Sequence, residues 1–254
     1  MTFAESVRAA EAGKTHLFSL GQAGFLIKSA GGQLLAIDPY LSDCVEKAEG
    51  GMGFKRLMPR LLSPEELTLT ALICTHFHMD HYDPDAVPGL MKNGVTRLFA
   101  ARDCRELALE QGLDMGRAAF VRPGDACACG DFDLRFIDCD HGEGAPLAVG
   151  AVIRVDGRVI CEVGDTRLRL DRAGDIPKGT DVLIAPINGA YGNMNEADCV
   201  ALALRAQPRL TVPCHYGMFA LHGGSPGRFL TLAQDAGLPC LLMTMGERYT
   251  FPES

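Results

Sequence analysis

The sequence predicts an α/β fold in which two β-sheets pack together and are covered by helices. Two observations predict it: strand-like runs near the N-terminus follow one another as hairpins, whereas later strand-like runs alternate with helical segments. The chain has 254 residues, of which 47% are hydrophobic, so it can bury one large core. No linker, low-complexity tract or simple repeat interrupts it, and we expect residues 1–254 to form a single domain.

The N-terminal part is expected to contain strands joined by short turns. The first dozen residues suit a short helix or a loose terminus, and Gly31-Gly32 is a natural tight turn between two strands. Residues 42–62 lack clear periodicity and are interpreted as a long loop, after which Ser63 and Glu66 form a capping box that starts a helical turn. The expected strands are 15–20, 24–29, 33–38 and 70–74.

Beyond the fourth strand, helices and strands alternate. Asp156-Gly157 is a strong hairpin signal, and Asn195 is expected to cap a helix. Cys127 and Cys129 are interpreted as part of a turn before a strand, with a redox or metal role as the alternative. The expected helices are 85–92, 103–111, 195–206 and 225–236, and the expected strands are 96–100, 118–121, 132–140, 148–155, 158–163, 181–187, 210–213 and 239–243.

The composition excludes several classes of partner. The formal net charge of −8 repels phosphate backbones, so we expect no nucleic-acid partner. No basic N-terminal region precedes an apolar run, and the longest apolar stretches, such as residues 148–155, are too short to span a bilayer. Several of the ten cysteines lie in apolar runs, which argues against a disulfide framework. We therefore expect a soluble, cytoplasmic protein without a membrane partner.

The strongest functional signal is a group of histidines and aspartates that follows the expected strand at 70–74. His76, His78, Asp80 and His81 stand in the order His-x-His-x-Asp-His, and imidazole and carboxylate are common ligands of divalent metals. Strand ends are where α/β folds gather functional groups, and three further candidate ligands follow later strands. These are His141, Asp165 and His215. The remaining histidines, His16 and His222, are expected to be ordinary core or surface residues.

These landmarks, preceded by Asp38 at the end of the third strand, resemble the metallo-β-lactamase superfamily. The resemblance implies an αββα sandwich of two similar halves, with two mixed β-sheets flanked by helices. It also implies a ligand set. His76, His78 and His141 would bind one metal, and Asp80, His81 and His215 a second, with Asp165 bridging them and Asp38 orienting the ligands from behind by hydrogen bonds.

Two adjacent divalent cations lower the pKa of a water bound between them, which makes a nucleophile at neutral pH. We expect Asp80 and Asp165 to hold that hydroxide as catalytic residues, and one of them to pass a proton to the leaving group. The ligand types suit one or two ions of manganese or zinc, and iron is not excluded. The small molecule that reacts there would be the main partner.

Three segments resemble one branch of this superfamily, the L-ascorbate-6-phosphate lactonases. These segments are residues 186–195, 213–219 and 53–57. This resemblance implies hydrolysis of a small sugar-acid lactone, with or without a phosphate, and a homo-oligomer. The expected substrate-binding residues are Lys55, Arg56, Asn188, Tyr191, Asn193 and Tyr216, with Arg60, Arg167 and Arg169 as further cations. A phosphodiesterase, a single-iron dioxygenase and a non-catalytic metal-binding member of the fold remain as alternatives.

Overall fold

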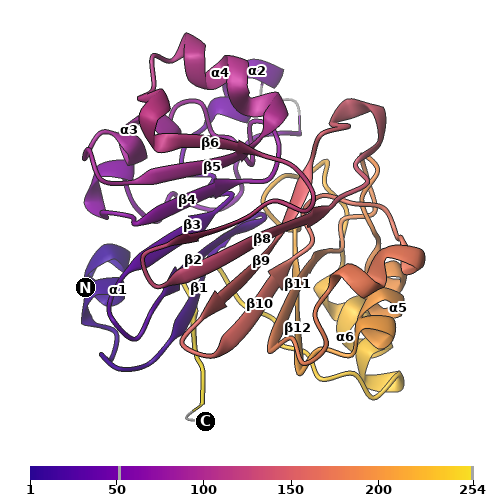
Figure 1. Ribbon diagram of the computed structural model, residues 1–254. Helices are drawn as coiled ribbons and strands as arrows, with labels where there is room; N and C mark the ends of the chain where they lie inside the picture. Colours follow the sequence, from indigo (N-terminus) through magenta and orange to yellow (C-terminus); the bar gives the residue numbers. More distant parts are fainter. Residues whose placement is uncertain (51–52, 253–254) are drawn as a thin grey trace.

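The computed structural model describes residues 1–50 and 53–252 and contains two β-sheets packed face to face, with helices on their outer sides (Figure 1). One sheet has seven strands in the order β13-β1-β2-β3-β4-β5-β6, and the other has six in the order β12-β11-β10-β9-β8-β7. Both sheets are mixed, so the predicted fold class is confirmed.

The seven-stranded sheet contains the first and last strands of the chain. Strands β1, β2 and β3 are antiparallel, β3 to β6 run parallel, and β13 pairs antiparallel with β1. Parallel β3 and β4 both point their carboxyl ends to the same edge of the sheet. The strands are β1 (His16–Gly21), β2 (Gly24–Lys28), β3 (Leu34–Ile37), β4 (Ala71–Cys74), β5 (Arg97–Ala101), β6 (Ala118–Val121) and β13 (Arg248–Thr250).

The six-stranded sheet is antiparallel from β7 to β10 and parallel from β10 to β12. Val155 faces Arg158 across the predicted Asp156-Gly157 turn, where both turn residues have positive φ, as a type I′ hairpin requires. The strands are β7 (Ala126–Cys129), β8 (Phe132–Asp138), β9 (Val149–Val155), β10 (Arg158–Glu162), β11 (Val182–Pro186) and β12 (Leu210–Cys214).

Helices cover the outer sides of the sandwich. Figure 1 shows α5 and α6 beside the six-stranded sheet, and α2, α3 and α4 beside the other. The predicted cap of α5 is confirmed, because Asn195 Oδ1 accepts from the backbone N–H groups of Ala197 and Asp198. In the described ranges, no helix has the length and hydropathy needed to cross a bilayer. The α-helices are α1 (Phe3–Ala9), α2 (Cys44–Glu49), α3 (Val87–Met91), α4 (Arg105–Glu110), α5 (Glu196–Ala206) and α6 (Pro226–Asp235), and short 3₁₀ turns occur at Pro64–Glu66, Arg102–Cys104, Met115–Arg117, Gly142–Gly144 and Leu170–Asp175.

The hydrophobic core has two main layers. The larger layer lies between the sheets and continues under α1 and α3, and it includes Ile73 of β4 and Phe136 of β8, both fully buried. The second layer lies between the six-stranded sheet and its helices, where Leu183 packs with Cys199 of α5 and Phe229 of α6. The strand ends that carry the candidate ligands are therefore held by packing on both sides.

Three secondary-structure predictions were wrong. Part of the expected loop 42–62 forms α2. This helix was missed because it is too short to show a helical period and buries only its first turn. Residues 51 and 52 of the expected loop lie outside the described residues. Residues 126–129 form β7 rather than a turn. Residues 239–243 make only an isolated bridge from Cys240 to Thr211, because the next bond of this parallel ladder would need an N–H from Pro213, which has none, and the last strand is β13.

Candidate metal centre

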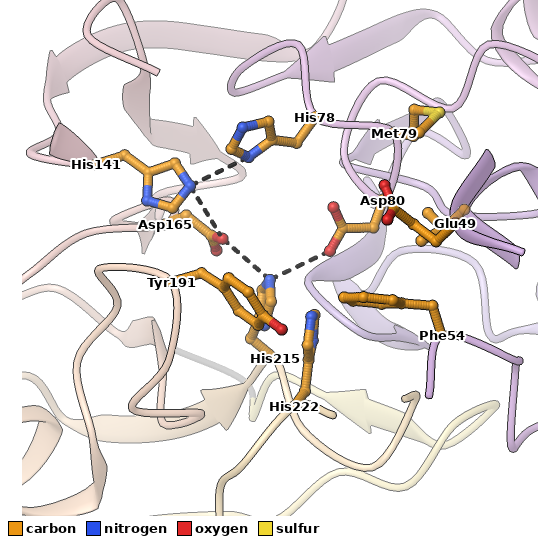
Figure 2. A pocket seen from close by; sticks show the side chains of 11 residues that line it. Glu49, Phe54, His78, Met79, Asp80, His141, Asp165, Tyr191, His215 and His222 are labelled. Carbon is orange, nitrogen blue, oxygen red and sulfur yellow. Dashed lines mark hydrogen bonds and ion pairs between the residues drawn. The ribbon is translucent and has the colours of Figure 1, made fainter. Parts of the chain in front are cut away.

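The predicted ligands converge at one edge of the sandwich, between the two sheets. His76, His78, Asp80 and His81 lie in the loop after β4. The other three each follow a strand of the second sheet, and Figure 2 shows them facing the loop across a cavity. They are His141 after β8, Asp165 after β10 and His215 after β12.

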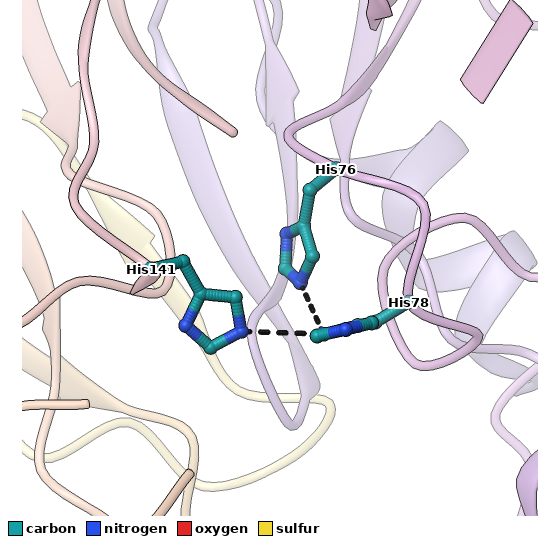
Figure 3. A group of neighbouring side chains, drawn as sticks. All are labelled: His76, His78 and His141. Carbon is teal, nitrogen blue, oxygen red and sulfur yellow. Dashed lines mark hydrogen bonds between the residues drawn. The ribbon is translucent and has the colours of Figure 1, made fainter. Parts of the chain in front are cut away.

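Three histidines form the first donor group, called here the three-histidine group: His76, His78 and His141. Nε2 of His76 lies 2.9 Å from Nδ1 of His78, which is 3.2 Å from Nε2 of His141 (Figure 3). Ligands about 2.1 Å from a tetrahedral metal are about 3.4 Å apart, close to these separations. His141 Nδ1 is buried without a hydrogen-bond partner among the described residues. Three imidazole nitrogens thus face one point, as a divalent metal requires.

Asp80, His81 and His215 form the second group, called here the mixed group. Nε2 of His81 is 3.6 Å from Asp80 Oδ2 and 3.3 Å from His215 Nε2, and Asp80 Oδ2 is 3.3 Å from His215 Nε2. Asp165 Oδ2 lies 3.0 Å from His215 Nε2 and 3.4 Å from His81 Nε2. The same oxygen is 3.8 Å from His141 Nε2 of the other group. Its place between the groups suits a bridging ligand.

Asp38 lies behind the mixed group rather than among the donors. Its Oδ2 is 2.6 Å from His81 Nδ1, which leaves His81 Nε2 free to face the other donors. The Thr75 backbone N–H donates to Asp38 Oδ1 at 2.8 Å, and the Thr75 hydroxyl donates to Oδ2 at 2.5 Å. A carboxylate that fixes the ring of a ligating histidine in this way sets both its tautomer and its direction.

The charges of the two groups differ. Burial alone would lower the pKa of His81, but the surrounding carboxylates, Asp165 first among them, raise it well above its usual range. At His215, too, burial would lower the pKa, but Asp165 and Asp80 raise it to about 9. Burial lowers the pKa of His76 well below its usual range and that of His141 to about 4. The mixed group therefore carries protons that a cation would displace, whereas the three-histidine group offers free lone pairs.

Both groups open into a cavity of about 340 Å³. Apolar and aromatic side chains form part of its wall, and the exposed Glu49 adds a carboxylate (Figure 2). Among the described residues, no lysine or arginine lines it. The wall consists of Val45, Glu49, Phe54, His78, Met79, Asp80, His141, Asp165, Tyr191, His215 and His222.

Of the predicted substrate-binding residues, the structure brings Tyr191 to the cavity and Asn193 to Asp165, a ligand that lines it. Tyr191 lines it with 58% of its surface exposed. Asn193 lies behind the wall, where its Nδ2 donates to Asp165 Oδ2 at 2.8 Å and so holds that carboxylate. Asn188 is buried and donates to the carbonyl of Ala190, which is turn chemistry. Tyr216 packs against the core layer under α5 and α6 and lines a different cleft.

The predicted cations do not reach the cavity. The Arg56 guanidinium donates to the carbonyls of Tyr40 and Ser42, both at 3.1 Å, and lies 4.5 Å from the centre of the Tyr40 ring. Lys55 is exposed outside the cavity wall. The remaining arginines are paired with carboxylates: Arg60 with Asp43, and Arg167 and Arg169 with Asp140, where these two line a separate cleft beside His141. Arg56 thus supports the loop before α2 and does not line the cavity.

Sequence reasoning missed two residues of the site. His222 was expected to be ordinary, yet it lines the cavity, and its ligand nitrogen lies within 4.8 Å of the ligand atoms of Asp80 and His215. Its place in the segment after His215 was the available signal. Gln22, in the turn between β1 and β2, is 2.8 Å from Asp80 Oδ2, and no sequence pattern indicated it. The prediction for His16 is confirmed: it is buried and bonds Thr250 and the Glu11 carbonyl.

Backbone strain is concentrated at this edge. Six described residues other than glycine have positive φ, and four belong to the site or its support: Gln22, Asp38, Tyr191 and His215. Such conformations cost about 1 kcal/mol or more and persist where the surrounding structure imposes them. The fold therefore aims these four side chains at a local cost in free energy.

Comparison with known proteins places this arrangement in a family. The family model for the β-lactamase superfamily domain matches residues 16–215, most of the chain and all of the predicted ligands. The chain belongs to the β-lactamase superfamily. It is similar to a UPF0173 metal-dependent hydrolase of Aeropyrum pernix, with 26% identity over 91% of this chain and 96% of the relative.

Solved structures agree with the fold. Igni18, a metallo hydrolase from Ignicoccus hospitalis, superposes with a TM-score of 0.71 at 20% identity, over 95% of this chain and all of that chain. An isothiocyanate hydrolase from Delia radicum gut bacteria superposes with a TM-score of 0.74 at 19% identity, over 93% of this chain and 98% of that chain. At such identities the likeness concerns the fold alone.

Proposed function

We propose that the protein is a metal-dependent hydrolase that binds two divalent cations between the ends of its sheets. The three-histidine group would hold one cation and the mixed group the other, with Asp165 between them. The observation that carries the proposal is the spacing of seven donor residues. Their nitrogens and oxygens lie 2.9–3.8 Å from one another, and no single hydrogen-bonding pattern satisfies all of them. The similarity to proteins described as metal-dependent hydrolases supports it.

Bound cations would supply a nucleophilic water of lowered pKa and would polarise the substrate carbonyl. The chain's own residues then orient the reaction. Asp165 and Asp80 present one carboxylate oxygen each toward the space between the groups, where each can accept a proton from water. Asn193 keeps Asp165 from turning away by its hydrogen bond to Oδ2. The apolar wall keeps bulk water from competing at the carbonyl.

Within this class we propose that the substrate is a small neutral ester, and a lactone in particular. The lactone follows from the resemblance of residues 186–195 and 213–219 to the lactonase branch. The absence of a lysine or arginine from the described wall favours a neutral molecule over a phosphorylated one, since an anion would meet Glu49 there. A phosphodiester would face the same lack of cations, apart from the metals themselves.

The proposal is tested by hydrolysis assays on one protein preparation after chelation and after reloading with zinc or manganese. The panel comprises neutral γ- and δ-lactones, L-ascorbate-6-phosphate and bis(p-nitrophenyl) phosphate. We expect turnover of neutral lactones that is lost on chelation and restored by metal. Faster turnover of the diester would favour a phosphodiesterase, and preference for the phosphorylated lactone would refute the argument from wall charge.

Asp165→Ala serves as the inactive reference, because Asp165 touches both donor groups. Asp114→Ala is the matched control, since this aspartate caps a 3₁₀ turn on the surface, away from the cavity. Retained activity in Asp165→Ala would sink the proposed mechanism. Metal bound tightly by the wild-type protein, without turnover of any substrate, would favour a binding role.

A further inference from the structure

Gln22 is held in an unusual position for a turn residue. It is only 4% exposed and has a left-handed φ of 54°, which residues other than glycine rarely adopt. Its carbonyl accepts from the His215 backbone N–H at 2.8 Å, which ties the turn between β1 and β2 to the loop after β12. The backbone conformation thus places the side-chain amide of Gln22 beside the mixed group.

The amide has two N–H donors, and two acceptors lie within reach. Gln22 Nε2 is 2.8 Å from Asp80 Oδ2 and 3.0 Å from His222 Nδ1. A carboxylate can only accept, so the nitrogen rather than the oxygen of the amide must face Asp80. The amide oxygen is buried and without a hydrogen-bond partner among the described residues, so no contact favours the flipped orientation.

His215 does not compete for the second donor. The amide nitrogen lies 3.4 and 3.3 Å from its Nδ1 and Nε2, and such similar distances place it over the face of the ring. Imidazole accepts hydrogen bonds in the ring plane, along the lone pair of one nitrogen. The second N–H of Gln22 therefore goes to His222.

This contact decides where His222 carries its proton. Because Nδ1 accepts, a neutral imidazole must have its proton on Nε2. In the described part of the chain, Nε2 has no hydrogen-bond partner, and the ring lines the cavity beside His215 (Figure 2). Stacking on His215 at 4.9 Å and edge contacts with Phe54 and Phe219 hold the ring in place. The result is a fixed N–H donor in the cavity wall.

We propose that Gln22 holds His222 in its Nε2–H form and that His222 donates this hydrogen bond to the substrate oxygen that gains negative charge. The role rests on the proposed hydrolase function. As water oxygen bonds to the carbonyl carbon, the π electrons of the C=O bond move to the carbonyl oxygen, and His222 stabilises that anion while keeping its proton. When the ester C–O bond breaks, these electrons re-form the carbonyl, and the alkoxide oxygen takes the proton that Asp80 or Asp165 accepted from the water. Gln22 is a positioning residue in this step, because it acts through His222.

The tautomer is tested directly by NMR on zinc-loaded protein with ¹⁵N-labelled histidine, which distinguishes protonated from unprotonated ring nitrogens. His222 is assigned by its disappearance in His222→Phe. We expect the Nε2–H form in the wild-type protein and a mixture of forms in Gln22→Met, which has similar size but no donor. Gln22→Glu is the matched variant: its carboxylate accepts from Nδ1–H and should reverse the tautomer. A wild-type Nδ1–H form, or a tautomer unchanged in both variants, would overturn the Gln22 contact.

Kinetics test the donor role. His222→Phe removes the N–H and should lower kcat on a neutral lactone by about 10²-fold or more, with the metal content unchanged. His222→Gln restores an N–H donor and should recover part of the loss. Equal kcat in wild type and His222→Phe would overturn the donor role. Absence of turnover in the zinc-loaded wild type would refute the proposed function and the donor role together, whereas NMR decides the Gln22 contact independently.

Discussion

Asp38→Asn changes one atom in a fully buried side chain, and the structure predicts that this change weakens metal binding. Asp38 accepts three hydrogen bonds, one at Oδ1 from the Thr75 N–H and two at Oδ2 from the Thr75 hydroxyl and His81 Nδ1. Asparagine has only one acceptor oxygen. If that oxygen stays with the Thr75 N–H, the new NH₂ group faces His81 Nδ1, which must then accept. The His81 proton moves to Nε2, and the nitrogen that faces the other donors loses its lone pair.

The opposite orientation of the asparagine costs more. Its NH₂ group would face the backbone N–H of Thr75 and leave a buried donor unsatisfied, at about 1–3 kcal/mol. We therefore expect the first orientation. Loss of such an outer contact to a metal-binding histidine weakens metal affinity by about 10- to 100-fold. That range corresponds to about 1.4–2.8 kcal/mol of binding free energy.

The assay is competitive titration of zinc against a chromophoric chelator, with thermal unfolding of the chelated proteins measured in parallel. Asp114→Asn is the matched control, because it alters a surface aspartate that also accepts from a backbone N–H. Zinc affinity of Asp38→Asn within twofold of the wild-type value would refute the reasoning. Reduced affinity with unchanged thermal stability would be the clearest support, since it would separate ligand orientation from folding.

Two further predictions concern protons and stability. His81 and His215 have raised pKa values in the metal-free protein, about 9 for His215, so both are protonated at pH 7 and zinc binding should release protons. Calorimetry in two buffers of different ionisation enthalpy measures this release. The affinity for zinc should weaken as the pH falls below 9, and zinc binding without proton release would contradict the charge assignment. Lys28 Nζ donates to three backbone carbonyls at the end of α1, so Lys28→Met should lower the free energy of unfolding by about 2 kcal/mol in urea titration. Lys47→Met removes an exposed ion pair and should cost less than about 0.5 kcal/mol, and equal losses would contradict the capping role.

Much of the fold could be predicted because local patterns carry it. The hairpin at Asp156-Gly157 and the cap at Asn195 depend on residues adjacent in sequence. The convergence of His141 and His215 could be anticipated since each follows an apolar strand, and strands of one sheet that run in the same direction end at a common edge. Helix α2 was missed because six residues with a single buried turn show no period.

The surroundings of the site could not be predicted in the same way. Arg56 carries the charge expected of a phosphate ligand, but its guanidinium is taken up by carbonyls of residues 40 and 42, which sequence does not reveal. Gln22 and His222 meet only because the turn after β1 and the loop after β12 pack together. They are 200 residues apart in the sequence, so no spacing rule connects them.

Every role proposed for this site depends on two metal positions built from two distinct donor groups. The number of zinc ions per chain, measured by plasma mass spectrometry after reconstitution and gel filtration, tests both positions. We expect two ions in the wild-type protein, and one each in His78→Ala, which disrupts the three-histidine group, and in His215→Ala, which disrupts the mixed group. A wild-type protein that retains no zinc, or variants that retain the full wild-type number, would contradict the account.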